Sequence, residues 1–112
     1  MKPNKNMDSD IMTFVWSAKA KITFLNVLDY LNENWTKKEI IQFNQRTQIT
    51  INAIRKNPNI FPASIKSKEI RKAIIDKNNS FYYKIDLYQQ EIHLLTFFDC
   101  RQDPKKVKLK TT

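Results

Sequence analysis

The stretch EIHLLTFFDCRQDP, residues 91–104, holds the most apolar segment of the chain and ends it on one arginine between two acids. Apolar residues continue almost without a break from Ile92 to Phe98, which is typical of a strand covered on both faces. We therefore expect a central strand over residues 91–99, buried beneath other elements. Arg101 would then lie at the rim of the fold, where this strand leaves the core.

A first helix is predicted over residues 17–34. Ser17 stands where a helix N-cap belongs, since its hydroxyl can accept a hydrogen bond from the first free amides. Apolar residues then follow at three-to-four spacing, which predicts a buried stripe on the helix. The residues of this stripe are Ile22, Leu25, Val27, Leu28 and Leu31.

A second helix is predicted over residues 36–57. Thr36 and Glu39 have the spacing of a capping box, and Pro58 ends the helix because proline disfavours a helical residue before it. The predicted buried stripe consists of Ile40, Phe43, Thr47, Ile51 and Ile54. The connection between the two helices is very short, so they should form an antiparallel hairpin.

Strand patterns occupy residues 11–16, before the helices, and residues 69–76, 81–88 and 91–99 after them. The breaks between the last three are short, which predicts two consecutive hairpins. Because the chain has no glycine, we expect Asn78 or Asn79 to take any left-handed turn conformation. The predicted fold is α+β, strand-helix-helix-three strands, with the helical hairpin packed on a small antiparallel-rich sheet.

The 112 residues suit one domain. We expect it over residues 11–106, between a flexible polar N-terminal tail (1–10) and a basic C-terminal tail (107–112), in which Val107 and Leu109 could form an extra edge strand or part of a basic strip. No window approaches the roughly 20 apolar residues of a membrane span, and the N-terminus is polar. The chain is therefore expected to be cytoplasmic, with no membrane partner.

The chain is strongly basic, with 20 Lys and Arg against 11 Asp and Glu, a formal charge of +9. This charge favours an acidic partner, either nucleic acid or an acidic protein, although a solvated basic surface would look the same. A lone Cys100 and a lone His93 can supply neither a disulfide nor a zinc set of three or four ligands. We therefore expect no metal and no cofactor.

Three segments resemble, in order, the RelE/ParE family of bacterial toxins from type II toxin–antitoxin systems. They are WSAKAKITFLNVLDYLNENW, IRKAIIDKNNSFYYKI and LLTFFDCRQDP, and the resemblance covers residues 13–106. It implies a toxin that stops growth and is neutralised by a cognate antitoxin. ParE-like members poison DNA gyrase, whereas RelE-like members are ribosome-dependent endoribonucleases that cut messenger RNA.

The resemblance also identifies candidate catalytic residues. Arg101 matches the arginine after the last core strand in both branches, and Arg71 matches the basic position that opens the first hairpin strand. Ser80 replaces an arginine of the ribonuclease branch, and the C-terminal tyrosine of that branch is missing. This incomplete set favours the ParE-like alternative. The candidate residues for binding nucleic acid or another target are Lys68, Lys72, Lys77, Lys105 and Lys106.

Each of these features has a second interpretation. Arg101 could be a structural clamp between Asp99 and Asp103, and the lysines could protect an edge strand from pairing with other sheets. His93 is more often a satisfied strand residue than an acid or base. A third function, in another class, is a non-toxic basic domain that binds nucleic acid or protein.

Overall fold

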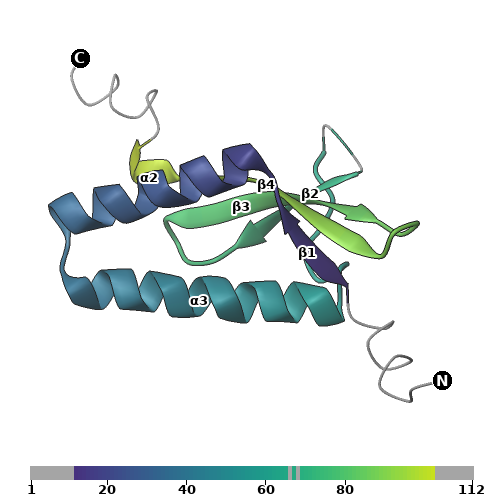
Figure 1. Ribbon diagram of the computed structural model, residues 1–112, viewed down its shortest axis with the longest axis horizontal. Coiled ribbons are helices and arrows are strands. Elements are labelled where there is room, and N and C mark those ends of the chain that lie inside the picture. The colour runs from purple at the N-terminus through teal and green to yellow at the C-terminus, as the bar shows by residue number, and fades with distance from the viewer. Residues whose placement is uncertain (1–11, 66, 68, 103–112) are drawn as a thin grey trace.

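The computed structural model describes residues 12–65, 67 and 69–102. Their elements follow the predicted order (Figure 1): β1 (Thr13–Trp16), α2 (Ala18–Asn34), α3 (Lys37–Lys56), β2 (Ile70–Ile74), β3 (Asn79–Asp86), β4 (Glu91–Asp99) and the 3-10 helix η1 (Cys100–Gln102). The expected tails over 1–10 and 107–112, and the candidates Lys68, Lys105 and Lys106, lie outside the described residues.

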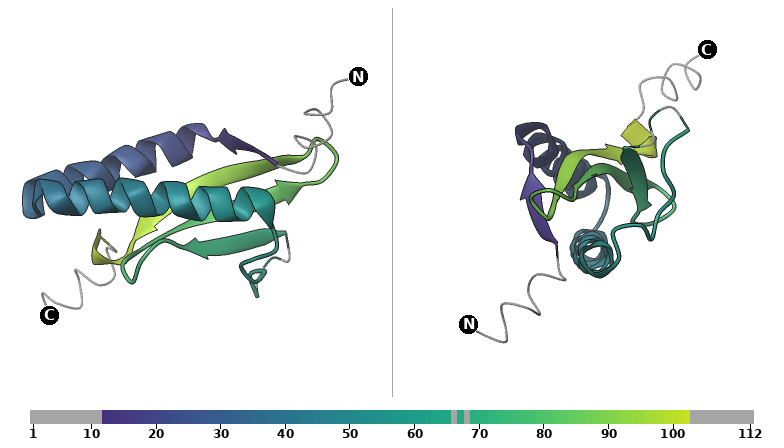
Figure 2. Two further views of the ribbon diagram at one scale, coloured as in Figure 1. Left: turned by 90° about the horizontal axis from the view of Figure 1, so that it is seen from below. Right: turned by 90° about the vertical axis from the view of Figure 1, so that its right-hand side faces the viewer.

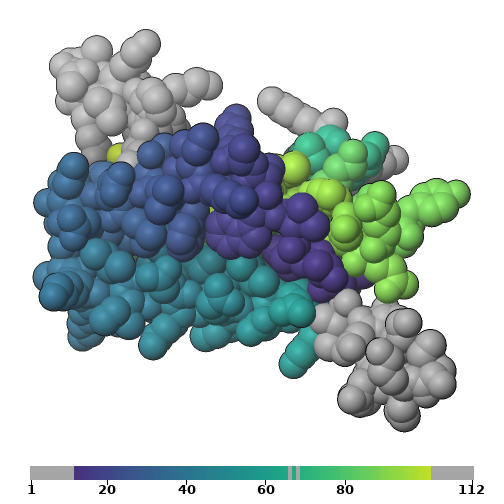
Figure 3. All heavy atoms as spheres, in the orientation of Figure 1, coloured from purple at the N-terminus to yellow at the C-terminus, as the bar shows by residue number. Residues whose placement is uncertain are grey.

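The four strands form one mixed sheet in the order β1-β4-β3-β2. β1 pairs with β4 in parallel, and the β2–β3 and β3–β4 pairs are the two predicted antiparallel hairpins. β4 is an inner strand, as predicted. The helices run antiparallel across one face of the sheet (Figure 2), and α2, α3 and β1 close that side of the molecule (Figure 3). None of the described helices is long and apolar enough to span a membrane.

The long apolar run of β4 has a different cause from the one predicted. The β3–β4 register shifts between Tyr82, which pairs with Thr96, and Tyr83, which pairs with Leu94, so Leu95 is an extra residue in β4. This bulge changes the alternation phase, and the buried set becomes Ile92, Leu94, Phe97 and Asp99. The expectation of cover on both faces was wrong, because within the described residues no helix lies on the second face, the open face (Figure 2).

α2 lies beside β4 where β1 ends, and two hydroxyls join them. The Ser17 hydroxyl accepts from the Ala20 N–H (2.9 Å), as a helix N-cap should, and also donates to the Leu95 carbonyl (2.9 Å). The Thr23 hydroxyl oxygen accepts from the Phe97 N–H at 2.9 Å. The helix therefore satisfies backbone groups that a neighbouring strand would otherwise pair.

The core lies between the helices and the sheet, around a cluster of aromatic rings. Its rings have centroids 5.0 to 6.5 Å apart and come from Trp16, Phe24, Phe43, Phe81, Tyr83 and Phe97. The stripe predicted for α3 packs inward as expected. On α2 two predicted core residues are wrong, because Ile22 and Leu25 are 59% and 57% exposed. Val27 and Leu31 are buried as predicted, and Ala20 lies beside them on the buried face of α2.

The structure confirms the predicted capping box but corrects the prediction for the left-handed turn residue. The predicted capping box is present, with the Glu39 carboxylate accepting from the Thr36 N–H at 3.2 Å. Among the described residues, however, the left-handed backbone conformation falls on Gln90 (φ 54°), in the β3–β4 turn, and not on Asn78 or Asn79. The β2–β3 turn is instead held by Asp76, whose Oδ1 accepts from the backbone N–H groups of both asparagines. This side chain removes the need for a left-handed residue there.

Candidate functional site

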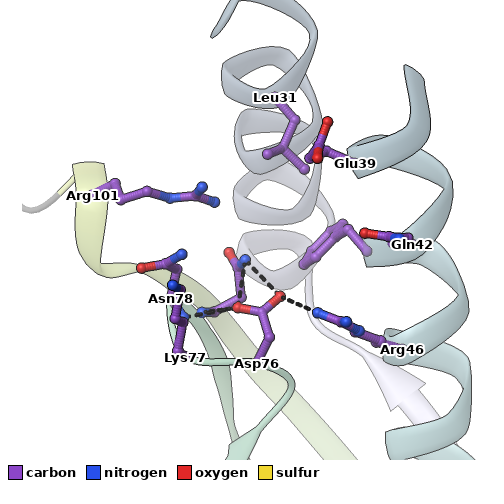
Figure 4. A pocket seen from close by; sticks show the side chains of 10 residues that line it. Leu31, Glu39, Gln42, Arg46, Asp76, Lys77, Asn78 and Arg101 are labelled. Carbon is purple, nitrogen blue, oxygen red and sulfur yellow. Dashed lines mark hydrogen bonds and ion pairs between the residues drawn. The ribbon is translucent and has the colours of Figure 1, made fainter. Parts of the chain in front are cut away.

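A pocket opens where the β2–β3 turn meets the connected ends of α2 and α3. We call it the Arg101 pocket (Figure 4); it has a volume of about 420 Å³ and is lined by Leu31, Glu39, Gln42, Phe43, Arg46, Asp76, Lys77, Asn78, Asn79 and Arg101. These residues come from both helices, the first β-hairpin and η1. The pocket therefore exists only once the helical hairpin has docked on the sheet.

Arg101 enters this pocket from η1 but is already held by Asp99. Its Nε and Nη2 donate to the two oxygens of the Asp99 carboxylate at 3.0 and 2.7 Å, and its backbone N–H donates to Asp99 Oδ1 at 2.8 Å. The Asp99 side chain is 0% exposed. These bonds raise the pKa of Arg101 above its ordinary value, outweighing the opposite effect of burial. The pair is the clamp considered above, with Asp99 as one arm; Asp103 lies outside the described residues.

Two aromatic rings at the end of α2 cover the same guanidinium. The Arg101 Cζ lies 5.3 Å from the ring centroid of Tyr30 and 5.4 Å from that of Trp35, within the range of cation–π attraction. The Arg101 side chain is left 20% exposed. It is therefore a rim residue, as predicted, but most of its surface and its strongest bonds serve the fold.

The carboxylates that line the pocket are also engaged. Glu39 holds the N-terminus of α3, and its pKa is lowered chiefly by its hydrogen bond with Thr36. Asp76 accepts from the Asn79 side-chain amide at 3.1 and 3.2 Å and lies 4.0 Å from Arg46 Nη1. By contrast, the buried Asn79 Oδ1 has no hydrogen-bond partner among the described residues. The pocket thus combines cations with an acceptor that is left unsatisfied.

Arg71 does not share the pocket of Arg101. It points to the helix-covered side of the β2 edge, where its Nη1 donates to the Phe61 carbonyl at 2.5 Å. It lines a separate hollow of about 410 Å³ with Met12, Pro58, Asn59, Glu69, Ile85 and Leu87. The two arginines that sequence reasoning placed in one catalytic set therefore face different hollows.

Lys72 lies in β2 and Lys77 in the β2–β3 turn. Both line a smaller hollow of about 130 Å³ on the open face, together with Phe98 and Cys100, and Lys77 also lines the Arg101 pocket. Ser80, at the position where the ribonuclease branch has an arginine, is buried in β3. Lys77 is therefore the predicted binding residue that the structure places beside Arg101.

Two solved structures share this arrangement of elements. A chain described as the chromosomal ParDE toxin–antitoxin system from P. aeruginosa superposes with a TM-score of 0.65 at 13% identity, over 80% of this chain and 97% of that one. A YoeB/ParE toxin from Agrobacterium tumefaciens gives a TM-score of 0.57 at 11% identity, over 79% and 98%. The chain has the RelE/ParE toxin fold. No protein-family model matches its sequence, and a search of curated proteins finds no significant match.

The sequence analysis did not identify several residues that lie around Arg101. Tyr30 and Trp35 cover its guanidinium, and Arg46 and Asp76 line the pocket beside it. The acid before KNNS, Asp76, was a usable signal, since Asp two residues before a turn often accepts from its backbone. Nothing local marks Arg46, because its position depends on how α3 docks.

Proposed function

We propose that this chain is the toxin of a type II toxin–antitoxin system, ParE-like, which stops bacterial growth by binding a macromolecular target in the cytoplasm, namely DNA gyrase. A cognate antitoxin would neutralise it. The fold supports this proposal, since it is shared with chains described as ParDE and YoeB/ParE proteins. At 11–13% identity these matches show only a shared fold. The proposed target is therefore argued from the chemistry of the pocket.

The acids around Arg101 already accept hydrogen bonds within the fold, and this favours target binding over RNA cleavage. Cleavage of RNA at its 2′-hydroxyl needs a group that removes a proton and another that protonates the leaving oxygen. Glu39, Asp76 and Asp99 already accept hydrogen bonds that hold a helix end, a turn and the Arg101 clamp. Recruiting any of them would cost the fold one of these bonds, which favours a function based on binding.

The same corner of the molecule suits an acidic partner surface. Arg46 is 54% exposed, Lys77 is exposed and the remaining edge of Arg101 faces the pocket between them. Cations arranged around one depression steer an anionic partner and set its orientation. We therefore assign the contact with the target to Arg46 and Lys77, and to Arg101 a supporting role.

The RelE-like alternative has one observation in its favour. Arg46 and Lys77 line one pocket with Arg101, and such a group of cations could hold phosphate. Such a site could stabilise charge on a ribosome-bound messenger RNA even where proton transfer depended on the ribosome.

Induction in a bacterial host separates these functions. We expect growth arrest with gyrase-dependent double-strand breaks, and relief of arrest in the double variant Arg46→Ala/Lys77→Ala. The matched control, Lys19→Ala/Lys21→Ala, removes the same charge from exposed positions on α2 and should remain toxic. Cleaved transcripts with intact chromosomes would instead establish the RelE-like function, and no arrest at all would leave the non-toxic binding domain.

A further inference from the structure

A second charged cluster lies at the other end of the sheet from the Arg101 pocket, where β3 turns into β4. This end of the hairpin extends past the helices (Figure 3). Here His93 Nε2 lies 3.2 Å from Glu91 Oε1 and 3.9 Å from Asp86 Oδ2. One ligand atom from each of the three residues can be chosen so that all lie within 4.8 Å of one another.

The strands hold these side chains in place. Asp86 and Glu91 are direct partners in the β3–β4 register, and Glu91 and His93 are two residues apart on one strand, so they project from the same face. All three are only partly exposed. A set built on paired strands is better preorganised than one built on a loop, because the backbone fixes the directions of the side chains.

Two of the three side chains in the cluster are carboxylates that face each other on paired strands. Like charges directly opposite each other on paired strands are destabilising, and Asp86 and Glu91 form such a pair in a chain whose net charge is +9. The nearest strand lysine, Lys84, pairs with His93 in register but gives its Nζ to Glu69 at 3.0 Å. A divalent ion held by all three side chains would offset the repulsion between the two carboxylates.

We infer that Asp86, Glu91 and His93 bind one divalent first-row transition metal ion, with zinc or manganese as the best matched. Oxygen and nitrogen ligands about 2.0–2.2 Å from such an ion lie about 3–3.6 Å apart, so the distances of 3.2 and 3.9 Å need only small side-chain movements. Two of the three residues, Asp86 and His93, also line a hollow of about 560 Å³, together with Lys84, Ile85, Leu87, Tyr88 and Leu95. The sequence analysis counted only cysteine and histidine as metal ligands, so it did not identify this set, in which two ligands are carboxylates.

The proposed metal site does not depend on the proposed toxin function.

The test is calorimetric titration of the full, tag-free chain with zinc and with manganese after chelator treatment. A histidine tag must be absent, since His93 is the single histidine of the sequence. We expect one ion per chain, and at least about tenfold weaker binding in His93→Ala and in Glu91→Gln. Asp29→Asn, which removes one exposed carboxylate from α2, is the matched control and should bind as the unmodified chain does.

Two further measurements keep the inference falsifiable. The lone imidazole gives a single set of ring proton signals, which should shift with zinc and broaden with manganese. Circular dichroism establishes that each variant folds, and Glu91→Gln replaces His93→Ala if the latter does not. No binding at millimolar metal would overturn the inference, as would binding that survives both ligand variants or that is lost in Cys100→Ser.

Discussion

At the residue scale, the bond between Arg101 and Asp99 decides how the end of β4 is built. A carboxylate with a fully buried side chain is costly unless a hydrogen-bonded cation neutralises it. Arg101 supplies two parallel hydrogen bonds and is itself covered by Tyr30 and Trp35. One side chain thus links the sheet to the end of α2.

Arg101→Ala should lower the free energy of unfolding by about 3 kcal/mol, because it leaves the Asp99 charge buried without a partner. Arg101→Lys should lose less, since it keeps the charge but not the bidentate geometry. Urea denaturation followed by circular dichroism measures both, with Lys77→Ala as the control. An unchanged transition in Arg101→Ala, together with loss of the proposed toxicity, would instead place Arg101 among the residues that contact the target.

Tyr83 predicts a dependence of stability on alkaline pH. Burial raises its pKa above the ordinary value of 10.0, although Arg71 opposes the shift, and its hydroxyl donates to the Pro58 carbonyl at 2.8 Å. A raised pKa in the folded state gives stability that is complete below the unfolded pKa and is lost as pH rises through the folded one. The free energy of unfolding should therefore fall above pH 10.

Tyr83→Phe tests this contribution. It should cost about 1 kcal/mol at neutral pH for the lost hydrogen bond and flatten the loss of stability above pH 10. Urea melts across the alkaline range measure both effects. An equally steep alkaline loss in Tyr83→Phe and in the unmodified chain would assign it to other groups.

At the element scale, the docking of α2 beside β4 is the unusual feature. β1 has only four residues, so the second half of β4 lacks a neighbouring strand on that side. Hydroxyls of Ser17 and Thr23 take over part of that role. The Thr23 hydroxyl donates to the Lys19 carbonyl of its own helix at 2.8 Å and accepts from β4, so it joins the helix to the strand.

Thr23→Val should destabilise the fold by about 1–3 kcal/mol, because it leaves the Phe97 N–H without an acceptor at similar side-chain volume. Thr23→Ser keeps the hydroxyl and is the matched control. Thermal unfolding should show the loss in the valine variant only, and amide exchange should be faster at Phe97. Equal stability of both variants would mean that water replaces the hydroxyl.

At the scale of the whole molecule, the net charge of +9 sets how the chain meets its partners. Opposite net charges raise the rate of association, and salt screens this effect over about 8–10 Å at physiological strength. The exposed cations near the Arg101 pocket and the positive net charge of the whole chain both raise the rate of association with an acidic partner. Affinity itself depends on close contacts and changes less with salt.

Under the proposed toxin function, the rate of association with the proposed antitoxin should fall as salt rises, while dissociation changes little. The partner to be tested is the product of the adjacent reading frame, which we expect to be small and acidic. Stopped-flow mixing at several ionic strengths measures both rates. A rate independent of salt would show that the charge has another purpose, such as solubility.

The RelE/ParE architecture was expected from the resemblance of three segments to that family. The sequence by itself determined the element order and both helix starts. These follow from hydrophobic periodicity, capping residues and turn residues, which act over a few neighbouring positions. The tertiary structure alone decided the bulge at Leu95, the exposure of Ile22 and Leu25, and the separation of Arg71 from Arg101. It also decided the meeting of Asp86, Glu91 and His93. The reason is that strand register and helix docking bring together residues distant in sequence, and no local pattern specifies which side chains then face one another.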